Sequence, residues 1–360
     1  MNNTENDITL GQYDLTNLFA KLLISNKNNP KMLAFLARYA NYRRKADSIR
    51  KKNAEAGLNI PAFLNCSITD FCNLNCQGCY ARASLDDAVR AQLSIEKWND
   101  IFAESVELGI ATIFILGGEP LVRKDVIEAA AKYPQILFFI FTNSTLIDDY
   151  YLSLFDEHRN LVPLLSIEGF EAETDARRGK GVYKAVTDAM DKLSSKGLLF
   201  GNAITVTRDN INTVLSDAFL NEMQSKGGRI IEFIEYVPFE HPELVLDNEG
   251  RDRLAAFMEE CRTARNDMIA LSFPGDERKT QGCIAGKAFF HISAAGDVEP
   301  CPFMPFSDTN IREMGIIEAL KSPFFKLLHT SGIQGKENLD GGCLYTHKDK
   351  VIELLEQSML

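Results

Sequence analysis

Between residues 60 and about 240 the sequence alternates short apolar runs with helical patterns, and no other feature restricts the fold as strongly. Strands that are apolar throughout, each followed by a helix, are typical of a parallel sheet with helices on its outer face. The predicted strands cover residues 62–69, 111–116, 136–142, 161–167, 199–207 and 229–237. The predicted helices between them cover residues 94–109, 124–133, 148–158, 181–197 and 212–227. Six such units do not complete the eight of a closed barrel, so the sequence predicts an α/β fold built on a partial (β/α)6, TIM-like barrel.

Two further regions flank the predicted barrel, which spans residues 61–245. Residues 1–60 are predicted to form a helical N-terminal extension, with one helix over residues 14–25 and a second after Pro30. Residues 246–360 are predicted to form a small α+β domain with a helix, a hairpin over residues 287–301 and two more helices. This region has few regular elements for its length, so we expect metal ligation to supply part of its stability.

Composition and charge exclude several classes of protein. The 360 residues carry a net charge of −11, which argues against a protein that mainly coats nucleic acid. No apolar run approaches the ~20 residues that span a bilayer. The N-terminus is polar and acidic, without the basic start and apolar stretch of a secretory signal. A cytoplasmic protein is therefore expected.

Residues 31–55 differ in charge from the rest of the chain. They hold eight basic and two acidic residues, a local balance of 8 − 2 = +6. Met32, Phe35, Leu36, Tyr39 and Tyr42 recur at helical spacing and form an apolar stripe. Such a helix can rest on an anionic membrane surface, which would make peripheral membrane contact and an apolar, membrane-derived substrate possible. Alternatively, it packs on the main domain and exposes a solvated basic face.

The eight cysteines are unevenly spaced. In a reducing cytosol they are expected to be core thiols, nucleophiles or metal ligands rather than disulfides. Cys72, Cys76 and Cys79 form C-x3-C-x2-C directly after the first predicted strand. Three thiolates from one loop suit an iron–sulfur cluster or zinc. Structural zinc requires four protein ligands, whereas a cubane held by three cysteines leaves one iron open to an external ligand.

With further motifs, the sequence resembles the radical S-adenosylmethionine (radical SAM) superfamily, whose hallmark is this cysteine triple after the first strand of a partial (β/α)6 barrel. The second predicted strand ends in GGEP, the third in TNS and the fourth in SIEG, which is followed by DARRG. The resemblance implies a [4Fe–4S] cluster on the three cysteines and SAM beside it. The residues it assigns to SAM are Gly117, Gly118, Glu119, Pro120, Asn143, Ser166 and Arg178.

The chemistry implied by this resemblance is reductive cleavage of SAM to a 5′-deoxyadenosyl radical, which abstracts hydrogen from a substrate. An electron donor such as flavodoxin or ferredoxin is then required, and nucleic acid is not an expected partner. The sequence does not identify the substrate, which is a peptide, a lipid or isoprenoid, or a small metabolite. The alternative is a non-catalytic iron–sulfur or zinc protein that retains the barrel. Candidate catalytic groups are Glu168, where relatives more often have Asp, and Glu235 and Tyr236 near the end of the sixth strand, beside Glu232.

The C-terminal cysteines resemble the opening of SPASM and twitch extensions, which bind auxiliary iron–sulfur clusters. Cys283 and Cys301 fit C-x12-G-x4-C, and Cys343 is the only cysteine that follows. This implies one auxiliary [4Fe–4S] cluster, with substrate, solvent, His347 or Cys261 as the fourth ligand; zinc, or no metal, is the alternative. Cys66 lies in an apolar strand and is expected to be a core thiol, and so is Cys261.

Overall fold

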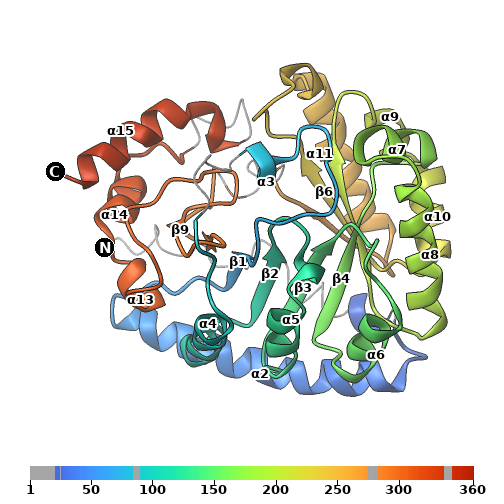
Figure 1. The fold of residues 1–360 in the computed structure, drawn as a ribbon, viewed down its shortest axis with the longest axis horizontal. Coiled ribbons are helices and arrows are strands. Elements are labelled where there is room, and N and C mark those ends of the chain that lie inside the picture. The colour runs from blue at the N-terminus through green and yellow to red at the C-terminus, as the bar shows by residue number, and fades with distance from the viewer. Residues whose placement is uncertain (1–20, 25, 84–89, 275–279, 281, 336–342) are drawn as a thin grey trace.

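The computed structural model describes residues 21–24, 26–83, 90–274, 280, 282–335 and 343–360. The expected helix over residues 14–25 lies mostly outside the described residues. Figure 1 shows a curled sheet in the centre of the molecule, with helices around its outer face. This is the predicted α/β, partial-barrel architecture.

A single sheet of nine strands forms the centre of the molecule, in the order β7-β6-β5-β4-β3-β2-β1-β8-β9. All neighbouring strands are parallel except β8 and β9. The six strands predicted from the sequence are β1 (Phe63–Ser67), β2 (Thr112–Leu116), β3 (Leu137–Thr142), β4 (Leu161–Ser166), β5 (Gly201–Val206) and β6 (Ile230–Glu235). The sheet is extended by β7 (Ile269–Ser272), β8 (Phe289–Ile292) and β9 (Val298–Glu299).

The helices between the strands cover the outer face of the sheet, and their apolar faces form the main core with it. They are α4 (Ile95–Leu108), α5 (Lys124–Ala131), α6 (Asp149–Glu157), α7 (Glu171–Arg178), α8 (Val182–Ser195), α9 (Ile211–Val214) and α10 (Asp217–Ser225). Two short elements lie at strand ends: α3 (Tyr80–Ala83) and the 3-10 helix η1 (Pro120–Val122). The single helix predicted over residues 212–227 is wrong, because Ser216 accepts a hydrogen bond from the Phe219 amide and caps a new helix, α10.

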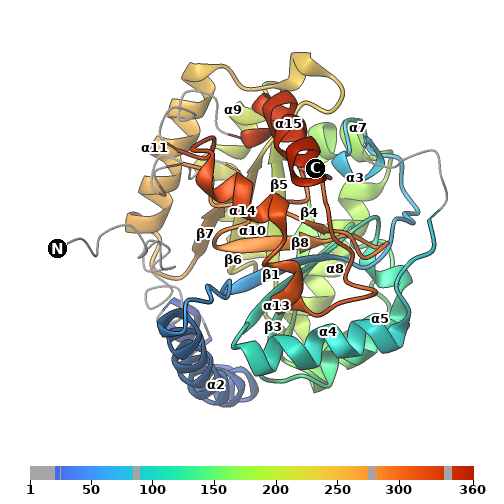
Figure 2. The same cartoon turned by 90° about the vertical axis from the view of Figure 1, so that its left-hand side faces the viewer.

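The basic N-terminal segment forms α2 (Pro30–Glu55), which crosses the lower end of the barrel (Figures 1 and 2). Four residues of its stripe, Met32, Phe35, Leu36 and Tyr39, are buried in a second core with inward-facing residues of β3, β4, β5, β6 and β7, and Tyr42 is half-buried. The Tyr39 hydroxyl donates to the Ala111 carbonyl at 2.8 Å. Most of the apolar stripe is thus packed against the N-terminal end of the barrel and is not available to a membrane.

The region after residue 245 is built onto the same sheet. α11 (Asn248–Ala264) leads into β7 beside β6, and β8 lies parallel to β1 on the other side. The predicted hairpin is β8 with β9. The last helices are α13 (Ile316–Ala319), α14 (Pro323–Thr330) and α15 (Lys348–Ser358), preceded by the 3-10 helix η4 (Leu344–His347). The boundary predicted at residue 245 stays a prediction.

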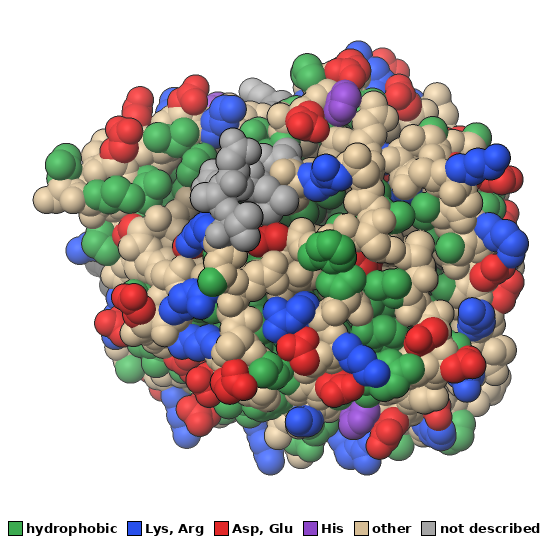
Figure 3. All heavy atoms as spheres, viewed as in Figure 1, with side chains coloured by type: hydrophobic (Ala, Val, Ile, Leu, Met, Phe, Trp, Pro, Cys, Tyr) green, Lys and Arg blue, Asp and Glu red, His purple; other side chains and the backbone are tan. Residues whose placement is uncertain are grey.

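Basic and acidic side chains are mixed on the face seen in Figure 3, including the lower edge where α2 lies. Among the described residues, no helix is both long and apolar enough to cross a membrane.

Candidate active site

One cavity of about 270 Å³ runs through the half-barrel from the loop after β1 to α2. At its upper end Cys72, Cys76 and Cys79 line it together with the strand ends of β2 and β4. At its lower end Tyr39 and neighbouring residues of α2 line it. We call the part between these ends the lumen. The predicted cysteine loop and the predicted SAM motifs therefore lie at one mouth, the C-terminal end of the strands.

The GGEP segment packs directly beneath the cysteine loop. The Gly118 amide donates to the Thr69 carbonyl at 2.8 Å, and the Glu119 amide donates to the Phe71 carbonyl at 2.9 Å. A Cβ atom on Gly118 would lie 2.2 Å from the Phe71 carbonyl oxygen, and Gly117 has φ of +129°. Only glycine fits at both positions, so this pair holds the loop against β2 as well as lining the mouth.

Polar side chains fix the cysteine loop from the opposite side. Asn143 Nδ2 donates to Asn73 Oδ1 at 2.8 Å and lies 4.0 Å from the Cys72 sulfur. Arg178 Nη1 lies 4.0 Å from the Cys76 sulfur. Burial raises the pKa of the Cys76 thiol, and the positive charges of Arg178 and Arg177 oppose that shift. An arginine beside the thiol favours its thiolate form, which is the form that binds iron.

Glu119 is almost fully buried and bonded to three donors. Its Oε1 accepts from the Leu121 amide and from Thr142 Oγ1, and its Oε2 accepts from the Asn143 amide at 2.7 Å. Burial nevertheless raises the pKa of this carboxyl. A carboxylate has about four acceptor positions, so one remains for a cationic group in the mouth. Pro120 does not line the cavity and instead begins η1, buried beneath it.

Glu168 is an ion-paired carboxylate. Its Oε1 accepts from Arg177 Nη1 at 2.7 Å and from Arg178 Nε at 2.8 Å, and its Oε2 accepts from the Thr205 amide at 3.0 Å. Only 1% of its side chain is exposed. Both arginines and Ser166 line the cavity, whereas Glu168 does not. The contacts therefore give Glu168 a positioning role toward Arg178.

The two candidates at the end of β6 point to different surroundings. Glu235 accepts from Arg251 Nε of α11 at 2.6 Å and is thus paired with the outer layer. The Tyr236 hydroxyl donates to the Glu240 carbonyl. It also occupies the space beside Gly78, where an added Cβ would lie 2.6 Å from it. Tyr236 therefore supports the cysteine loop.

Glu232 lies beside Glu235 and Tyr236 in the sequence, but it is not among the candidate catalytic groups predicted from the sequence. It lies on β6 between Ile230 and Ile234, on the face toward the lumen, and 5% of it is exposed. Burial alone raises the pKa of Glu232 to about 8. Strict alternation along the strand could have identified it, because an acid among isoleucines on the inward face is out of pattern.

The three C-terminal cysteines lie near one another. Cys283 and Cys343 both influence the pKa of the buried Cys301 thiol, which burial raises well above its usual value. Cys261 is influenced instead by charges on α10 and α11, so the structure does not bring it to this group. Among the described residues, no three His, Cys, Asp or Glu side chains converge on one point as ligands of a single ion would. In a cubane each cysteine binds a different iron atom, so such convergence is not required.

Aromatic rings connect the two cysteine groups. Tyr80, next to Cys79, stacks edge-on against Phe303 with ring centroids 4.9 Å apart. Phe303 is two residues after Cys301, and Phe239 joins it to Tyr345, two residues after Cys343. Beside them His291 links Ser67 and Glu299, at 2.7 Å through Nε2 and 2.6 Å through Nδ1. The region between the two groups is thus packed and hydrogen-bonded.

The sequence of this chain is similar to a known family and to characterised relatives. Residues 66–218 match the Radical SAM superfamily. The AdoMet-dependent heme synthase of Methanosarcina barkeri is 26% identical over 307 residues, which cover 77% of this chain and 88% of the relative. Mycofactocin maturase MftC of Mycolicibacterium smegmatis is 27% identical over 266 residues, which cover 69% of this chain and 66% of the relative.

Solved structures agree in fold. Streptococcus suis SuiB bound to S-adenosylmethionine has a TM-score of 0.66 at 16% identity, over 82% of this chain and 74% of that one. Native anSMEcpe with bound AdoMet has a TM-score of 0.59 at 14% identity, over 83% of this chain and 97% of that one. At these identities the likeness concerns the fold.

Proposed function

We propose that this chain, which is a radical SAM enzyme related to SPASM-type members, binds SAM at the mouth of the half-barrel and applies its radical to a substrate held in the lumen. Such enzymes use a [4Fe–4S] cluster to cleave SAM reductively to a 5′-deoxyadenosyl radical, which abstracts hydrogen from the substrate. The observation that carries the proposal is a single cavity. All three cysteines of the loop, the glycines of GGEP, Ser166 and Arg178 line it, and it continues inward to α2.

In this proposal Cys72, Cys76 and Cys79 hold the cluster as thiolates. Arg178, itself held by Glu168, faces the Cys76 sulfur and supplies positive charge beside it. Glu119 keeps one acceptor position for the SAM ammonium, and Ser166 offers a hydroxyl to its ribose. α2 packs across the far end of the lumen and so limits the access of bulk water to the reacting centre from that side.

We assign Cys283, Cys301 and Cys343 to one auxiliary [4Fe–4S] cluster. The mutual influence of their thiols supports this assignment, as does the SPASM type of the relatives. His347 is the candidate fourth ligand within the described residues, because it ends η4, the element that Cys343 precedes. Cys261 is not a candidate, because the charged groups that influence its thiol belong to α10 and to α11 and its C-terminal end, and not to the group of Cys283, Cys301 and Cys343.

The substrate in this proposal has an apolar group that enters the lumen. Phenylalanine rings of β1, β2 and β3 line the cavity, and a largely apolar wall selects an apolar group. The relatives are named as heme synthase, maturase and peptide cyclase, so their names do not point to one substrate. The lipid hypothesis loses its support, because the apolar stripe of α2 is buried. The electron comes from a small donor such as flavodoxin or ferredoxin.

An assay for 5′-deoxyadenosine tests the activity against the non-catalytic alternative. The protein, reconstituted anaerobically with iron and sulfide, is incubated with SAM and dithionite, and the nucleoside products are quantified. We expect 5′-deoxyadenosine and methionine in equal amounts, formed over more than one turnover. A reconstituted protein that binds iron but leaves SAM intact would instead be a non-catalytic iron–sulfur protein.

A further inference from the structure

Glu232 is a buried carboxyl with no partner in the described part of the chain. Only 5% of the Glu232 surface is exposed, and its Oε2 atom forms no hydrogen bond to any described residue. Across the sheet it lies opposite Ala203 of β5 and Leu271 of β7, neither of which offers a polar side chain. Leaving such a group unpaired destabilises a fold, so its presence inside a cavity indicates a ligand.

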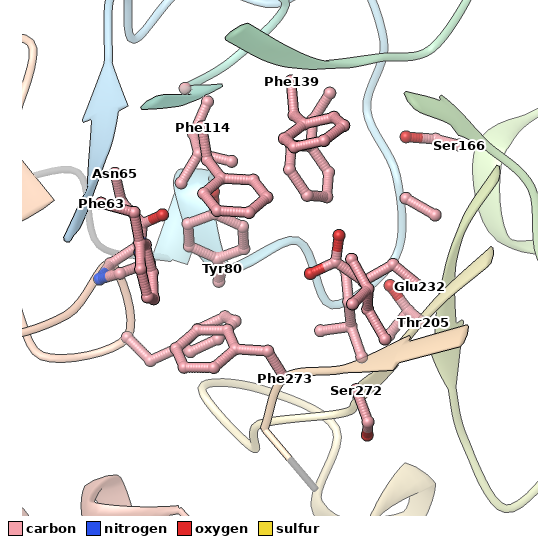
Figure 4. Close-up of a pocket in the computed structure, with 18 of the residues that line it drawn as sticks. Phe63, Asn65, Tyr80, Phe114, Phe139, Ser166, Thr205, Glu232, Ser272 and Phe273 are labelled. Carbon is pink, nitrogen blue, oxygen red and sulfur yellow. The ribbon is translucent and has the colours of Figure 1, made fainter. Parts of the chain in front are cut away.

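The surroundings of Glu232 are aromatic. Figure 4 shows its carboxyl pointing into the cavity, which the rings of Phe63, Phe114, Phe139 and Phe273 also line. Phe114 stacks on Phe139 with centroids 5.2 Å apart and meets Phe63 at 5.5 Å. These rings form the aromatic part of a wall that also includes Asn65, Thr205 and Ser272.

Other charged groups line the same cavity but lie toward its ends. Arg43, Asp47 and Arg50 come from α2 at the lower end, and Glu119, Arg177, Arg178, Glu235 and the cysteine thiols come from the mouth. None of them influences the pKa of Glu232, which burial alone raises. Glu232 is therefore the acidic group of the middle of the lumen.

We propose that the lumen binds a protonated organic amine, whose nitrogen pairs with Glu232 while its apolar part contacts the phenylalanine rings. A carboxylate neutralises the cation, and aromatic faces attract it further through their quadrupoles. A neutral apolar ligand would leave Glu232 unpaired and gain nothing from it. This inference rests on the proposed function, in which the lumen holds the substrate. It restricts the substrate to molecules that carry a protonated amine.

Binding of such an amine releases a proton. In the free protein near pH 7 Glu232 is mostly protonated, since its pKa is about 8. When the ammonium group binds, the carboxylic acid loses its proton to solvent and an ion pair forms. Affinity therefore increases as the pH rises toward 8, and levels off above it.

The test is calorimetric titration of the reconstituted, SAM-loaded protein without reductant. The probes are 2-phenylethylammonium chloride and the neutral 2-phenylethanol. For the wild type we expect the ammonium to bind at least about tenfold tighter at pH 8.5 than at pH 6.5. At pH 6.5, titrations in two buffers of different ionisation enthalpy should show release of nearly one proton. The alcohol should show neither effect.

Variants separate the carboxyl from general packing. Glu232→Gln keeps the size and removes the charge, so the ammonium should bind at least about tenfold more weakly and without pH dependence. Glu107→Gln, on the exposed face of α4, makes the same charge change outside the lumen and should bind like the wild type. Phe139→Leu should weaken the ammonium more than the alcohol.

The proposal is overturned if the wild type binds neither probe, binds both equally, or binds the ammonium without proton release. Proton release is measured on the wild type alone, so this test remains valid even if Glu232→Gln does not fold. The same wild-type sample is assayed for 5′-deoxyadenosine after addition of dithionite. Nucleoside formation without amine binding defeats this inference and leaves the proposed function standing. Amine binding without SAM cleavage would defeat the proposed function but leave the assignment of Glu232 as an amine-binding group standing.

Discussion

At the scale of single residues, the buried carboxyls in and around the cavity are of two kinds. Glu168 and Glu235 are paired with arginines, whereas Glu232 is not. Sequence motifs led to the paired group, because Glu168 lies in SIEG, but not to the unpaired one. A motif records residues next to one another in the chain, while the isolation of Glu232 arises from apolar neighbours on β5 and β7 that are distant in sequence.

Glu168→Gln should weaken SAM binding, because Arg178 loses the carboxylate that holds it beside Cys76. Removing one partner of a buried ion pair also destabilises a fold by roughly 3 kcal/mol. SAM affinity and thermal midpoint are therefore measured together for Glu168→Gln and Glu168→Asp. The aspartate keeps the charge and should restore most of the SAM affinity. Equal SAM affinity in the wild type and Glu168→Gln would contradict the positioning role.

The burial of Glu232 predicts a pH dependence of stability. Its pKa is raised to about 8 in the fold, so between its usual value and 8 the folded state retains a proton that the unfolded state has lost. The contribution of Glu232 to stability therefore falls as the pH rises through this window. The advantage of Glu232→Gln over the wild type should grow by about 2 kcal/mol between pH 5.5 and 7.5. Unfolding at both pH values measures it, and an advantage that does not change with pH would refute a raised pKa.

At the scale of elements, the cysteine loop depends on the segment beneath it. Gly118→Ala would place a methyl group 2.2 Å from the Phe71 carbonyl oxygen, which is backbone and cannot rotate away. The loop must then shift, and we expect the reconstituted variant to lose most of the iron held by that loop. Gly250→Ala, in α11, is the control, because an added Cβ there would meet only side-chain atoms, at 3.3 Å or more. Iron content decides the matter, and full iron in Gly118→Ala would show that the contact is not needed.

Which elements the sequence predicted depends on how much local pattern each one carries. β1 to β6 are apolar runs between turn residues, so they were predicted close to their actual bounds. α7 was missed because Thr174 is its only buried residue and no apolar stripe marks it. β7 was missed because four residues give little periodicity, and its pairing with β6 is not local. The parallel pairing of β8 with β1, more than two hundred residues apart, leaves no signal in either segment.

At the scale of the whole molecule, the two ends of the chain complete the barrel. α2 closes its lower opening, and β8 and β9 extend the sheet next to β1, which leads into the cysteine loop. The C-terminal cysteines are therefore attached to the strand that leads into the cysteine loop. The aromatic contacts from Tyr80 to Phe303 and Tyr345 join the two regions.

Iron counting tests the two-cluster organisation. The reconstituted wild type should bind about eight iron atoms, as two [4Fe–4S] clusters require. A variant with Cys283, Cys301 and Cys343 all changed to alanine should bind about four, and its remaining cluster should still be reducible by dithionite in an electron paramagnetic resonance spectrum. About four atoms in both proteins would leave a single cluster and remove the auxiliary one.

The most direct test of the account is formation of 5′-deoxyadenosine by single-cysteine variants. Cys76→Ala removes one of the three thiols at the mouth, whereas Cys261→Ala removes a buried thiol on α11 that does not line the cavity. After identical reconstitution with iron, sulfide, SAM and dithionite, Cys261→Ala should form the nucleoside at close to the wild-type rate. Cys76→Ala should form none above the background without protein. Cleavage of SAM by Cys76→Ala at a rate comparable to the wild type would contradict the assignment of this loop as the catalytic centre.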